Sequence, residues 1–598
     1  MESEIFSINL RVDKQVTDIE FHDVTYSTKI KNGYKKIIDG VSGKFYSGHL
    51  SAIMGPSGAG KTSLLNILTG YQIAGTSGNI KCSSPNKRKK ILHYRKESCY
   101  ILQDDNLPLL FTVQESMMMA CNLKLNNITE KAKEFLINDI LTNLGLLKTK
   151  NIRCHNLSGG QKKRLSIALE LVDNPPIMFL DEPTTGLDSL STTQCVQMLK
   201  KLANGGRIIV CTIHQPNAHT YELFDQVYMM ANGRCVYQGT SMNTVPYLAS
   251  VGLYCPHYHN PADYFMEVVS GDYGNYLDVL EIQAKEDKWK YVPTIKMSDN
   301  LTLVDNNIVY TDNGGINEAP PEWKRFFTLL RKNAIQLYRD WTISQLRVLL
   351  HFLIGLILGF TFQSCGRDAT KIFSNLGFLQ FGIVYLTYTS MMPAVLKFPS
   401  ELVILKKENF NNWYKLSTYY AAFLVFDIPQ QVLYSLVYCL GSYFISDQPL
   451  EIIRFTMVFS VLTLSSLSAS GVGLIIGTLT DPINGIFFGS IILAVMICFG
   501  GFVIIFTHMS KVMYYFTYIS YISFSTEGLM QAVYGFNRAP LNCPEEADYC
   551  HLTSSEDLLK TMGMESPNYW LDVGYLCCAF IFFRTIAFVT LRRKLSTS

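Results

Sequence analysis

The chain has 598 residues, which is too long for one hydrophobic core and predicts at least two domains. Apolar residues make up 48% of it and charged residues only 17%, against about 25% charged in typical soluble domains. The long uncharged runs lie almost wholly after Val348, which predicts a membrane-embedded second half. The net charge of +3 is too small to predict a nucleic-acid partner. Met1 to Asp18 is polar with mixed charges, so we expect no secretory signal and a cytosolic N-terminus.

A phosphate-binding pattern lies between an apolar run at 50–54 and a helix-like run at 63–68. It fits G-x-x-x-x-G-K-[ST] and reads Gly55, Pro56, Ser57, Gly58, Ala59, Gly60, Lys61, Thr62 and Ser63. Glycines let successive backbone N–H groups turn inward, and the following helix N-terminus adds positive potential for phosphate. Lys61 can reach the β- and γ-phosphates, while Thr62 can offer its hydroxyl to Mg²⁺. A chance match in a glycine-rich turn is the alternative, but the strand–loop–helix context disfavours it.

A second turn suited to phosphate reads Leu157-Ser158-Gly159-Gly160-Gln161 and precedes an apolar helix pattern at 165–172. Its exposed N–H groups and hydroxyl could contact phosphate oxygens, although many turns share this sequence. An apolar strand at 177–180 follows and ends in Asp181 and Glu182. Asp181 can hold Mg²⁺, and Glu182 can polarise an attacking water.

Three further features complete this half of the chain. A short strand at 100–104 contains Gln103, and Gly186-Leu187-Asp188 follows the two carboxylates. A strand at 207–213 ends in His214, where an imidazole could reach a γ-phosphate. A lone histidine is more often structural, but one at a strand end behind these motifs is a candidate for catalysis.

The order of these elements resembles the nucleotide-binding domain of ATP-binding-cassette (ABC) proteins. The resemblance implies an α/β P-loop domain over residues 1–270, with ATP and Mg²⁺ as cofactors. It implies that two such domains sandwich two ATP molecules, each between the phosphate loop of one subunit and Ser158 to Gly160 of the other. The other residues implied at the site are Thr62, Asp181 and the sensor Gln103 on the metal, Glu182 and the switch residue His214 in catalysis, and Gln161 and Asp188 on the nucleotide.

The two halves are joined by a polar, aperiodic stretch at 271–320, which we expect to be a partly disordered linker. Aromatic and aliphatic residues then recur at helical spacing over 321–342, with arginines and lysines between them. This pattern predicts a basic amphipathic helix that suits either the cytosolic membrane surface or a groove on the nucleotide domain.

Six long apolar stretches predict an all-α transmembrane domain with six spans over residues 343–598. They are Val348–Phe362, Asn375–Leu396, Tyr419–Phe444, Phe455–Leu479, Ile483–Phe506 and Trp570–Leu591. The amphipathic helix, the loop at 397–415 and the C-terminal tail are rich in lysine and arginine, which predicts that both termini face the cytosol. The large loop before the last span is acidic and is expected outside.

Cys543 and Cys550 lie in that external loop and are a disulfide candidate, because oxidation is favoured outside the cell. Two charged residues stand out within the apolar spans, Asp427 in the third and Arg584 in the sixth. Each is by default a functional hypothesis. The alternatives are that Asp427 sits near an interface and that Arg584 extends its side chain toward one.

A nucleotide domain ahead of a six-span domain resembles the G subfamily of ABC half-transporters, and is most similar to its sterol- and lipid-exporting branch. The likeness rests on Asn156 to Leu171, Asn174 to Pro176, Cys211 to Pro216, Tyr258 to Asp263, Ser374 to Leu379, Phe499 to Val503, Tyr518 to Tyr521 and Tyr534-Gly535. It implies short re-entrant helices within about 511–536 and an apolar plug at Phe502 and Val503 in the transport path. Leu402 stands where many relatives place a basic residue, and Ala394 where drug exporters place a stacking phenylalanine.

We therefore expect a half-transporter that hydrolyses ATP to export lipid or sterol-like amphiphiles. One chain holds one phosphate loop and one Ser-Gly-Gly turn, so it needs a second half-transporter subunit, as a homodimer or a heterodimer. It is expected to be a multi-pass protein of the plasma membrane. Pigment precursors or xenobiotics are alternative substrates for the same fold. A soluble ABC ATPase is the alternative from another class, and the six apolar stretches disfavour it.

Overall fold

A computed structural model describes residues 18–30, 33–84, 87–90, 95–286, 289–290, 319–341, 344–544, 550, 553–564 and 568–596. The chain divides into two compact units. The first consists of Met1–Thr328 and Lys406–Lys415, and the second of Leu329–Leu405 and Leu416–Ser598. The expected division into a nucleotide half and a membrane half therefore has one exception, because ten residues from the membrane half belong to the first unit.

The first unit is built on a six-stranded sheet of the order β10-β9-β3-β8-β7-β6. The pairs β3–β8, β3–β9, β7–β8 and β6–β7 are parallel, and β10 pairs with β9 antiparallel. The strands are β3 (Leu50–Met54), β6 (Ser98–Ile101), β7 (Ile177–Leu180), β8 (Ile208–Thr212), β9 (Gln226–Ala231) and β10 (Arg234–Gly239). Strands β3, β7, β8 and β9 are buried along their whole length, as their apolar sequences predict for parallel strands covered on both faces.

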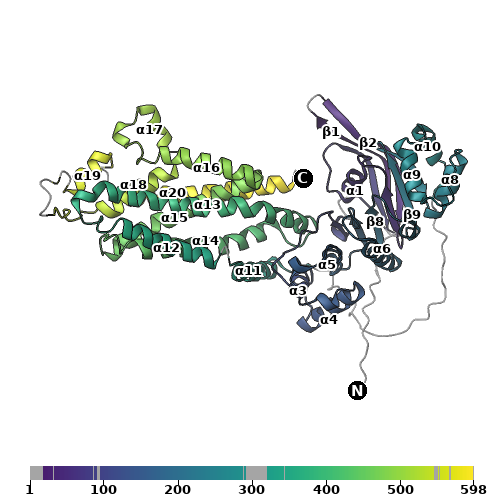
Figure 1. Ribbon diagram of the computed structural model, residues 1–598, viewed down its shortest axis with the longest axis horizontal. Helices are drawn as coiled ribbons and strands as arrows, with labels where there is room; N and C mark the ends of the chain where they lie inside the picture. The colour runs from purple at the N-terminus through teal and green to yellow at the C-terminus, as the bar shows by residue number, and fades with distance from the viewer. Residues whose placement is uncertain are drawn as a thin grey trace, which may run out of the picture. The chain divides into compact units, whose positions relative to one another are not determined.

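Helices surround this sheet, which confirms the expected α/β fold (Figure 1). They are α1 (Lys61–Thr69), α3 (Val113–Lys124), α4 (Glu130–Asn143), α5 (Gly159–Leu171), α6 (Ser189–Asn204), α7 (Ala218–Glu222), α8 (Thr244–Ser250), α9 (Pro261–Ser270) and α10 (Leu277–Ala284). A second, antiparallel sheet contains β1 (Asp18–Ile30), β2 (Gly33–Tyr46), β4 (Thr76–Ser84) and β5 (Lys87–Lys90) in the order β2-β1-β4-β5.

The start of the expected linker contains an ordered helix. Helix α10 lies inside that stretch and packs on β10. Arg234 of β10 pairs with Asp278 at 3.3 Å and with Glu281 at 3.0 Å, and the Tyr247 hydroxyl donates to the carbonyl of Leu280 at 2.8 Å. Asp278 and Glu281 therefore form ion pairs with the neighbouring strand. The rest of the expected linker, at 291–318, lies outside the described residues.

The expected amphipathic helix is α11 (Glu322–Arg339). Its first turn belongs to the first unit and packs on α3. Arg325 Nε donates to the Leu123 carbonyl at 3.1 Å, and Lys324 Nζ donates to Asn126 Oδ1 at 3.1 Å. The sequence predicted that this helix would lie either on the membrane surface or on the nucleotide domain. The first turn of α11 lies on the nucleotide domain.

The second unit is all-α, and its long helices run side by side (Figure 1). Within the described residues, four helical segments are long and apolar enough to cross a membrane: 369–410, 416–442, 452–479 and 569–596. Two shorter apolar helices, at 345–361 and 482–498, coincide with the first and fifth expected spans. The helices are α12 (Gln345–Thr361), α13 (Ile372–Phe410), α14 (Leu416–Ser442), α15 (Ile452–Leu479), α16 (Pro482–Cys498), α17 (Lys511–Thr517), α18 (Tyr521–Tyr534), α19 (Ser555–Met562) and α20 (Tyr569–Ser596).

Helix α15 is the most buried of the four long apolar segments, and its small residues explain its close packing. A Cβ added at Gly473 would lie 2.5 Å from the Met391 carbonyl oxygen, and one at Gly477 would lie 2.9 Å from that of Ala394. Only glycine therefore lets α15 approach the backbone of α13 at these points.

The fifth apolar stretch is shorter as a helix than expected, because α16 ends at Cys498 rather than continuing to Phe506. The chain turns at Gly501, whose φ of 79° favours glycine. Phe502 and Val503 therefore lie beyond the helix, and 37% and 59% of their surfaces are exposed. Helices α17 and α18 confirm two short helices within 511–536.

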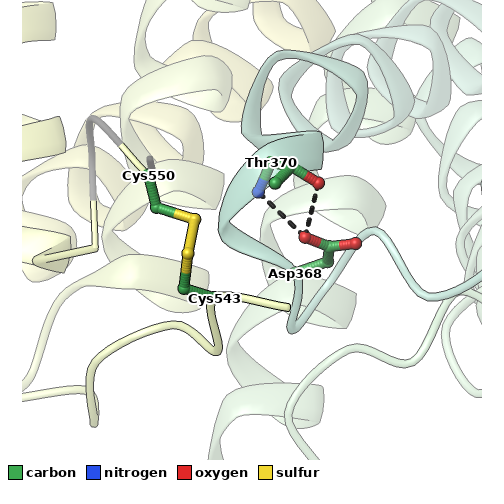
Figure 2. The surroundings of a disulfide bond; sticks show 4 residues. All are labelled: Asp368, Thr370, Cys543 and Cys550. Carbon is green, nitrogen blue, oxygen red and sulfur yellow. Dashed lines mark hydrogen bonds between the residues drawn. A yellow bond between two sulfur atoms is a disulfide. The ribbon is translucent and has the colours of Figure 1, made fainter. Parts of the chain in front are cut away.

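Cys543 and Cys550 form the expected disulfide, with a Cα–Cα distance of 6.1 Å (Figure 2). The neighbouring residue Asn542 forms a β-bridge with Asp368, which precedes α13. The Asp368 carboxylate accepts hydrogen bonds from the backbone N–H and the hydroxyl of Thr370, at 2.9 and 2.6 Å. The disulfide loop is thereby attached to the start of a long apolar helix.

Asp427 and Arg584 form an ion pair with each other inside the second unit. Ser470 donates to Asp427 Oδ2 at 3.0 Å, and Gln431 donates to Asp427 Oδ1 at 3.1 Å. Three helices thus supply donors to one carboxylate, which compensates the buried charge.

We expect Arg584→Gln to destabilise the second unit by about 3–5 kcal/mol, because it leaves the Asp427 charge buried without its partner. The neutral double variant Asp427→Asn/Arg584→Gln should recover much of that loss. Thermal unfolding of the purified proteins in detergent measures both effects. Wild-type stability in the single variant would contradict a structural role for the pair.

Candidate nucleotide site

The phosphate loop occupies the turn between β3 and α1, as its sequence predicts. Gly55 has a φ of 150°, and a Cβ there would lie 2.1 Å from the Met230 carbonyl oxygen. Gly60 has a φ of 97° and precedes α1 without any side-chain cap, so the first N–H groups of the helix remain available. Lys61 Nζ donates to the carbonyls of Gly55 at 2.8 Å and Pro56 at 3.0 Å. The loop therefore closes around the lysine and forms a cradle suited to phosphate.

Asp181 lies at the end of β7, directly opposite the loop. Its Oδ1 atom accepts hydrogen bonds from the hydroxyls of Thr212, at 2.6 Å, and Thr62, at 3.1 Å. Burial raises the pKa of Asp181, and these hydrogen bonds oppose the shift. Burial likewise lowers the pKa of Lys61, opposed by the charges of Glu182 and Asp181. The Thr62 hydroxyl and the Asp181 carboxylate lie next to each other, and such oxygen ligands suit a Mg²⁺ ion.

Glu182 is held in a left-handed backbone conformation, with a φ of 44°. Its N–H donates to Thr212 Oγ1 at 2.8 Å. Its Oε2 atom accepts hydrogen bonds from Gln103 Nε2 at 2.8 Å and from Thr185 Oγ1 at 2.9 Å. The structure thus brings Gln103 and Glu182 together. A non-glycine residue with positive φ is a strained position of the kind that gathers at functional sites.

The Ser-Gly-Gly turn forms the N-terminus of α5. Ser158 and Gln161 cap it reciprocally, with the Gln161 N–H donating to Ser158 Oγ at 3.3 Å and the Ser158 N–H donating to Gln161 Oε1 at 3.1 Å. Ser158 and Gly159 are exposed. Asp188 caps α6 by accepting from the Ser191 N–H at 3.1 Å, and hydrogen bonds from the side chain and the backbone of Ser191 hold the pKa of the Asp188 carboxyl below the usual value. These residues face outward, where a second subunit could reach them.

His214 directly follows Ile213 at the end of β8, and its side chain is exposed. Its position after β8 agrees with the sequence prediction, while its catalytic role stays a prediction.

Sequence reasoning missed Thr212, which contacts both predicted carboxylate residues. Its hydroxyl donates to Asp181 and accepts from the Glu182 N–H. A threonine in the apolar run before His214 was the available signal, but a single hydroxyl in a β-rich run is too common to be singled out.

Sequence reasoning also missed the ten-residue segment Lys406–Lys415, which we call the 406–415 segment. It packs into the first unit against two functional elements. On α5, Lys407 Nζ donates to Ser166 Oγ at 2.6 Å, and Trp413 Nε1 donates to Glu170 Oε2 at 3.3 Å. On β6, the Asn411 side chain bonds the backbone of Tyr100. The segment therefore contacts the strand that leads to Gln103 and the helix that follows Ser158.

Aromatic packing reinforces this attachment. The Phe410 ring packs edge-on against the rings of Tyr71 and Tyr100, with centroids 5.1 and 6.0 Å apart. The Arg95 guanidinium lies over the same ring at 4.3 Å. The Lys407 side chain is buried as well, with 4% of the residue exposed. These contacts bury the segment in the nucleotide unit.

Known protein families match both halves of the chain. The family described as "ABC transporter" matches residues 38–185, and the family described as "ABC-2 type transporter" matches residues 324–534. A second ABC-2 type family matches residues 214–278.

Relatives match this chain over almost its whole length. The pig protein "Broad substrate specificity ATP-binding cassette transporter ABCG2" (Sus scrofa) is 27% identical over 96% of this chain and 93% of its own. "ABC transporter G family member 21" from Arabidopsis thaliana is 27% identical over 96% and 90%. "Protein white" from Drosophila melanogaster is 25% identical over 94% and 83%.

The fold, the phosphate site and these matches define an ATPase that is coupled to a membrane transport domain. The chain belongs to the ABC transporters, and its relatives place it with the half-transporters of the G subfamily. It is a multi-pass membrane protein that couples ATP hydrolysis to transport.

We expect Thr212→Val to lower kcat for ATP hydrolysis by at least about tenfold, because it frees both carboxylate residues from their shared hydroxyl. Thr212→Ser keeps the hydroxyl and serves as the matched control. ATPase assays on the reconstituted protein measure both variants. A valine variant as active as the serine variant would remove Thr212 from the site.

Proposed function

We propose that this chain forms a dimeric half-transporter that uses ATP to export lipid or sterol-like amphiphiles. The assignment of the nucleotide site is supported by the cluster of Lys61, Thr62, Gln103, Asp181 and Glu182 around one turn. Ser158 to Gln161 and Asp188 would complete the site of a second subunit, which is a copy of this chain or a related half-transporter.

Mg²⁺, when bound with ATP, would neutralise phosphate charge and orient the γ-phosphate. Thr62 and Asp181 would hold it from one side, and Gln103 from another. Gln103 now donates to Glu182, so it would have to leave that carboxylate to reach the metal. Glu182 would then be free to accept a hydrogen bond from the attacking water and polarise it. Lys61 would stabilise the β- and γ-phosphate oxygens, and His214 would contact the γ-phosphate.

The observation that carries the lipid assignment is an exposed apolar face on α16 and the turn after it. Helix α16 contains no charged residue. Its large exposed side chains are Ile483, Ile486, Phe487, Phe488, Ile491 and Val495, and they are followed by Phe502 and Val503. A surface of this kind suits the apolar body of a lipid and offers no partner for an ion. Ala394, opposite Gly473, provides no aromatic clamp for a flat drug.

Pigment precursors and xenobiotics are the competing substrate classes, and an ATPase assay against a panel of lipids, sterols and aromatic drugs separates them. Stimulation by lipids or sterols alone supports the proposal, and stimulation by aromatic drugs alone contradicts it. We further propose a plasma-membrane location with cytosolic termini, which the lysine and arginine distribution and the disulfide loop support.

Glu182→Gln should retain ATP binding and nearly abolish turnover, because the amide cannot polarise the water while Lys61 and the metal ligands remain. Binding of a fluorescent ATP analogue and steady-state ATPase activity, measured on the same preparation, check this. Unchanged turnover would show that Glu182 is not the catalytic carboxylate.

Replacing both Phe502 and Val503 with alanine should alter transport or uncouple it from ATPase activity, with normal surface expression. The two side chains are exposed within one chain, so their loss spares its own core. Leu349→Ala/Phe352→Ala, which removes a similarly exposed apolar pair from α12, is the control. Normal transport in the Phe502/Val503 variant would refute a plug, and loss of folded protein would indicate a packing role.

A further inference from the structure

The Asn411 side chain closes the open edge of the six-stranded sheet. Strand β6 pairs with β7 on one side only, so its other edge needs hydrogen-bond partners. The Tyr100 N–H donates to Asn411 Oδ1 at 3.0 Å, and Asn411 Nδ2 donates to the Tyr100 carbonyl at 3.0 Å. A single amide therefore satisfies both backbone groups of Tyr100, as a neighbouring strand would.

Tyr100 carries this restraint into the nucleotide site. The residue is 2% exposed, and its hydroxyl lies 2.7 Å from Asn66 Oδ1 and 3.5 Å from Asp181 Oδ2. Asn66 is on α1, the helix that the phosphate loop opens. The Asp181 N–H also donates to the carbonyl of Ile101, the residue after Tyr100, at 2.9 Å. The position of β6 thus sets both the backbone and the carboxylate surroundings of Asp181.

We infer that Asn411 and Tyr100 are positioning residues for the magnesium carboxylate Asp181. The inference rests on the proposed role of Asp181. Asn411 hydrogen-bonds the backbone of Tyr100 and acts through β6. It lies between α13 and α14, in the 406–415 segment of the first unit.

A purely anchoring role is the competing explanation, since Phe410, Lys407 and Trp413 attach the same segment to the same unit. The Lys407–Ser166 contact provides the matched control. Ser166→Ala removes an anchor of the 406–415 segment on α5 and leaves β6 untouched. An anchoring role predicts similar behaviour for Asn411→Ala and Ser166→Ala, while a positioning role separates them.

The test is the Mg²⁺ dependence of nucleotide binding by the full-length, reconstituted protein. Glu182→Gln is introduced into every variant to prevent hydrolysis, and binding of a fluorescent ATP analogue is followed as Mg²⁺ is titrated. We expect Asn411→Ala to raise the Mg²⁺ midpoint by about three- to tenfold, as for the loss of one or two hydrogen bonds. Tyr100→Phe should raise it in the same direction, and the double variant should exceed either single one by little, because both act on one route. Ser166→Ala should leave it unchanged.

Each other outcome overturns a defined part of the inference. An unchanged midpoint in Asn411→Ala, or an equal shift in Ser166→Ala, shows an anchoring role only. Shifts that add fully in the double variant show two independent effects. Tyr100→Phe removes one hydroxyl and keeps the hydrogen bonds between Asn411 and the β6 backbone, so an unchanged midpoint in this variant overturns the role of the Tyr100 hydroxyl. If Asp181→Asn leaves the midpoint unchanged, the proposed metal role of Asp181 fails instead.

Discussion

The nucleotide unit depends most on the restraint of one buried carboxylate, Asp181. A charged group that is largely dehydrated must be compensated by hydrogen bonds or by a cation. Here Thr62 contributes a hydroxyl from the phosphate-loop helix, and Thr212 contributes one from the adjacent strand. Every element that reaches Asp181 is thereby fixed relative to the loop that would hold phosphate. The next residue, Glu182, has a left-handed backbone, and its carboxylate accepts a hydrogen bond from Gln103.

Much of this site could be predicted from sequence, because its chemistry requires particular residues at short spacing. The glycines and lysine of the phosphate loop, the apolar strand before Asp181 and the Ser158 turn each have a local physical reason. No local sequence pattern pointed to a role for Thr212, Tyr100 or Asn411. Tyr100 and Asn411 are far apart along the chain, and their contact arises because β6 is an edge strand with one open side.

In the membrane unit, too, local sequence predicted the elements but not the contacts between distant residues. The apolar stretches predicted six helices, but hydropathy could not place the end of α16, which a glycine turn brings before Phe506. Asp427 and Arg584 were each recognisable as costly in an apolar span. Their pairing was not, since it depends on the packing of α14 beside α15 and of α15 beside α20. The disulfide was predictable because its two cysteines are close in sequence and share one polar loop.

Each unit gives its own reason to expect that a second molecule binds this chain. In the proposed function, the phosphate loop, Asp181 and Glu182 form one side of a nucleotide site, while Ser158, Gly159 and Asp188 are exposed. This proposal makes one chain half of a composite site, whose activity would require a second copy or a related subunit. The exposed apolar face of α16 calls for a partner or a lipid for a separate reason, the cost of leaving such a surface in water.

The composite site is tested most directly by combining two inactive chains. A Ser158→Arg chain and a Lys61→Met chain should each form inactive homodimers, one for lack of the turn and the other for lack of the loop lysine. In a mixed dimer, the intact loop of the first chain meets the intact turn of the second. We expect mixed dimers, isolated through two different affinity tags, to recover ATPase activity that neither homodimer has. Mixed dimers as inactive as both homodimers would contradict a site shared between two chains.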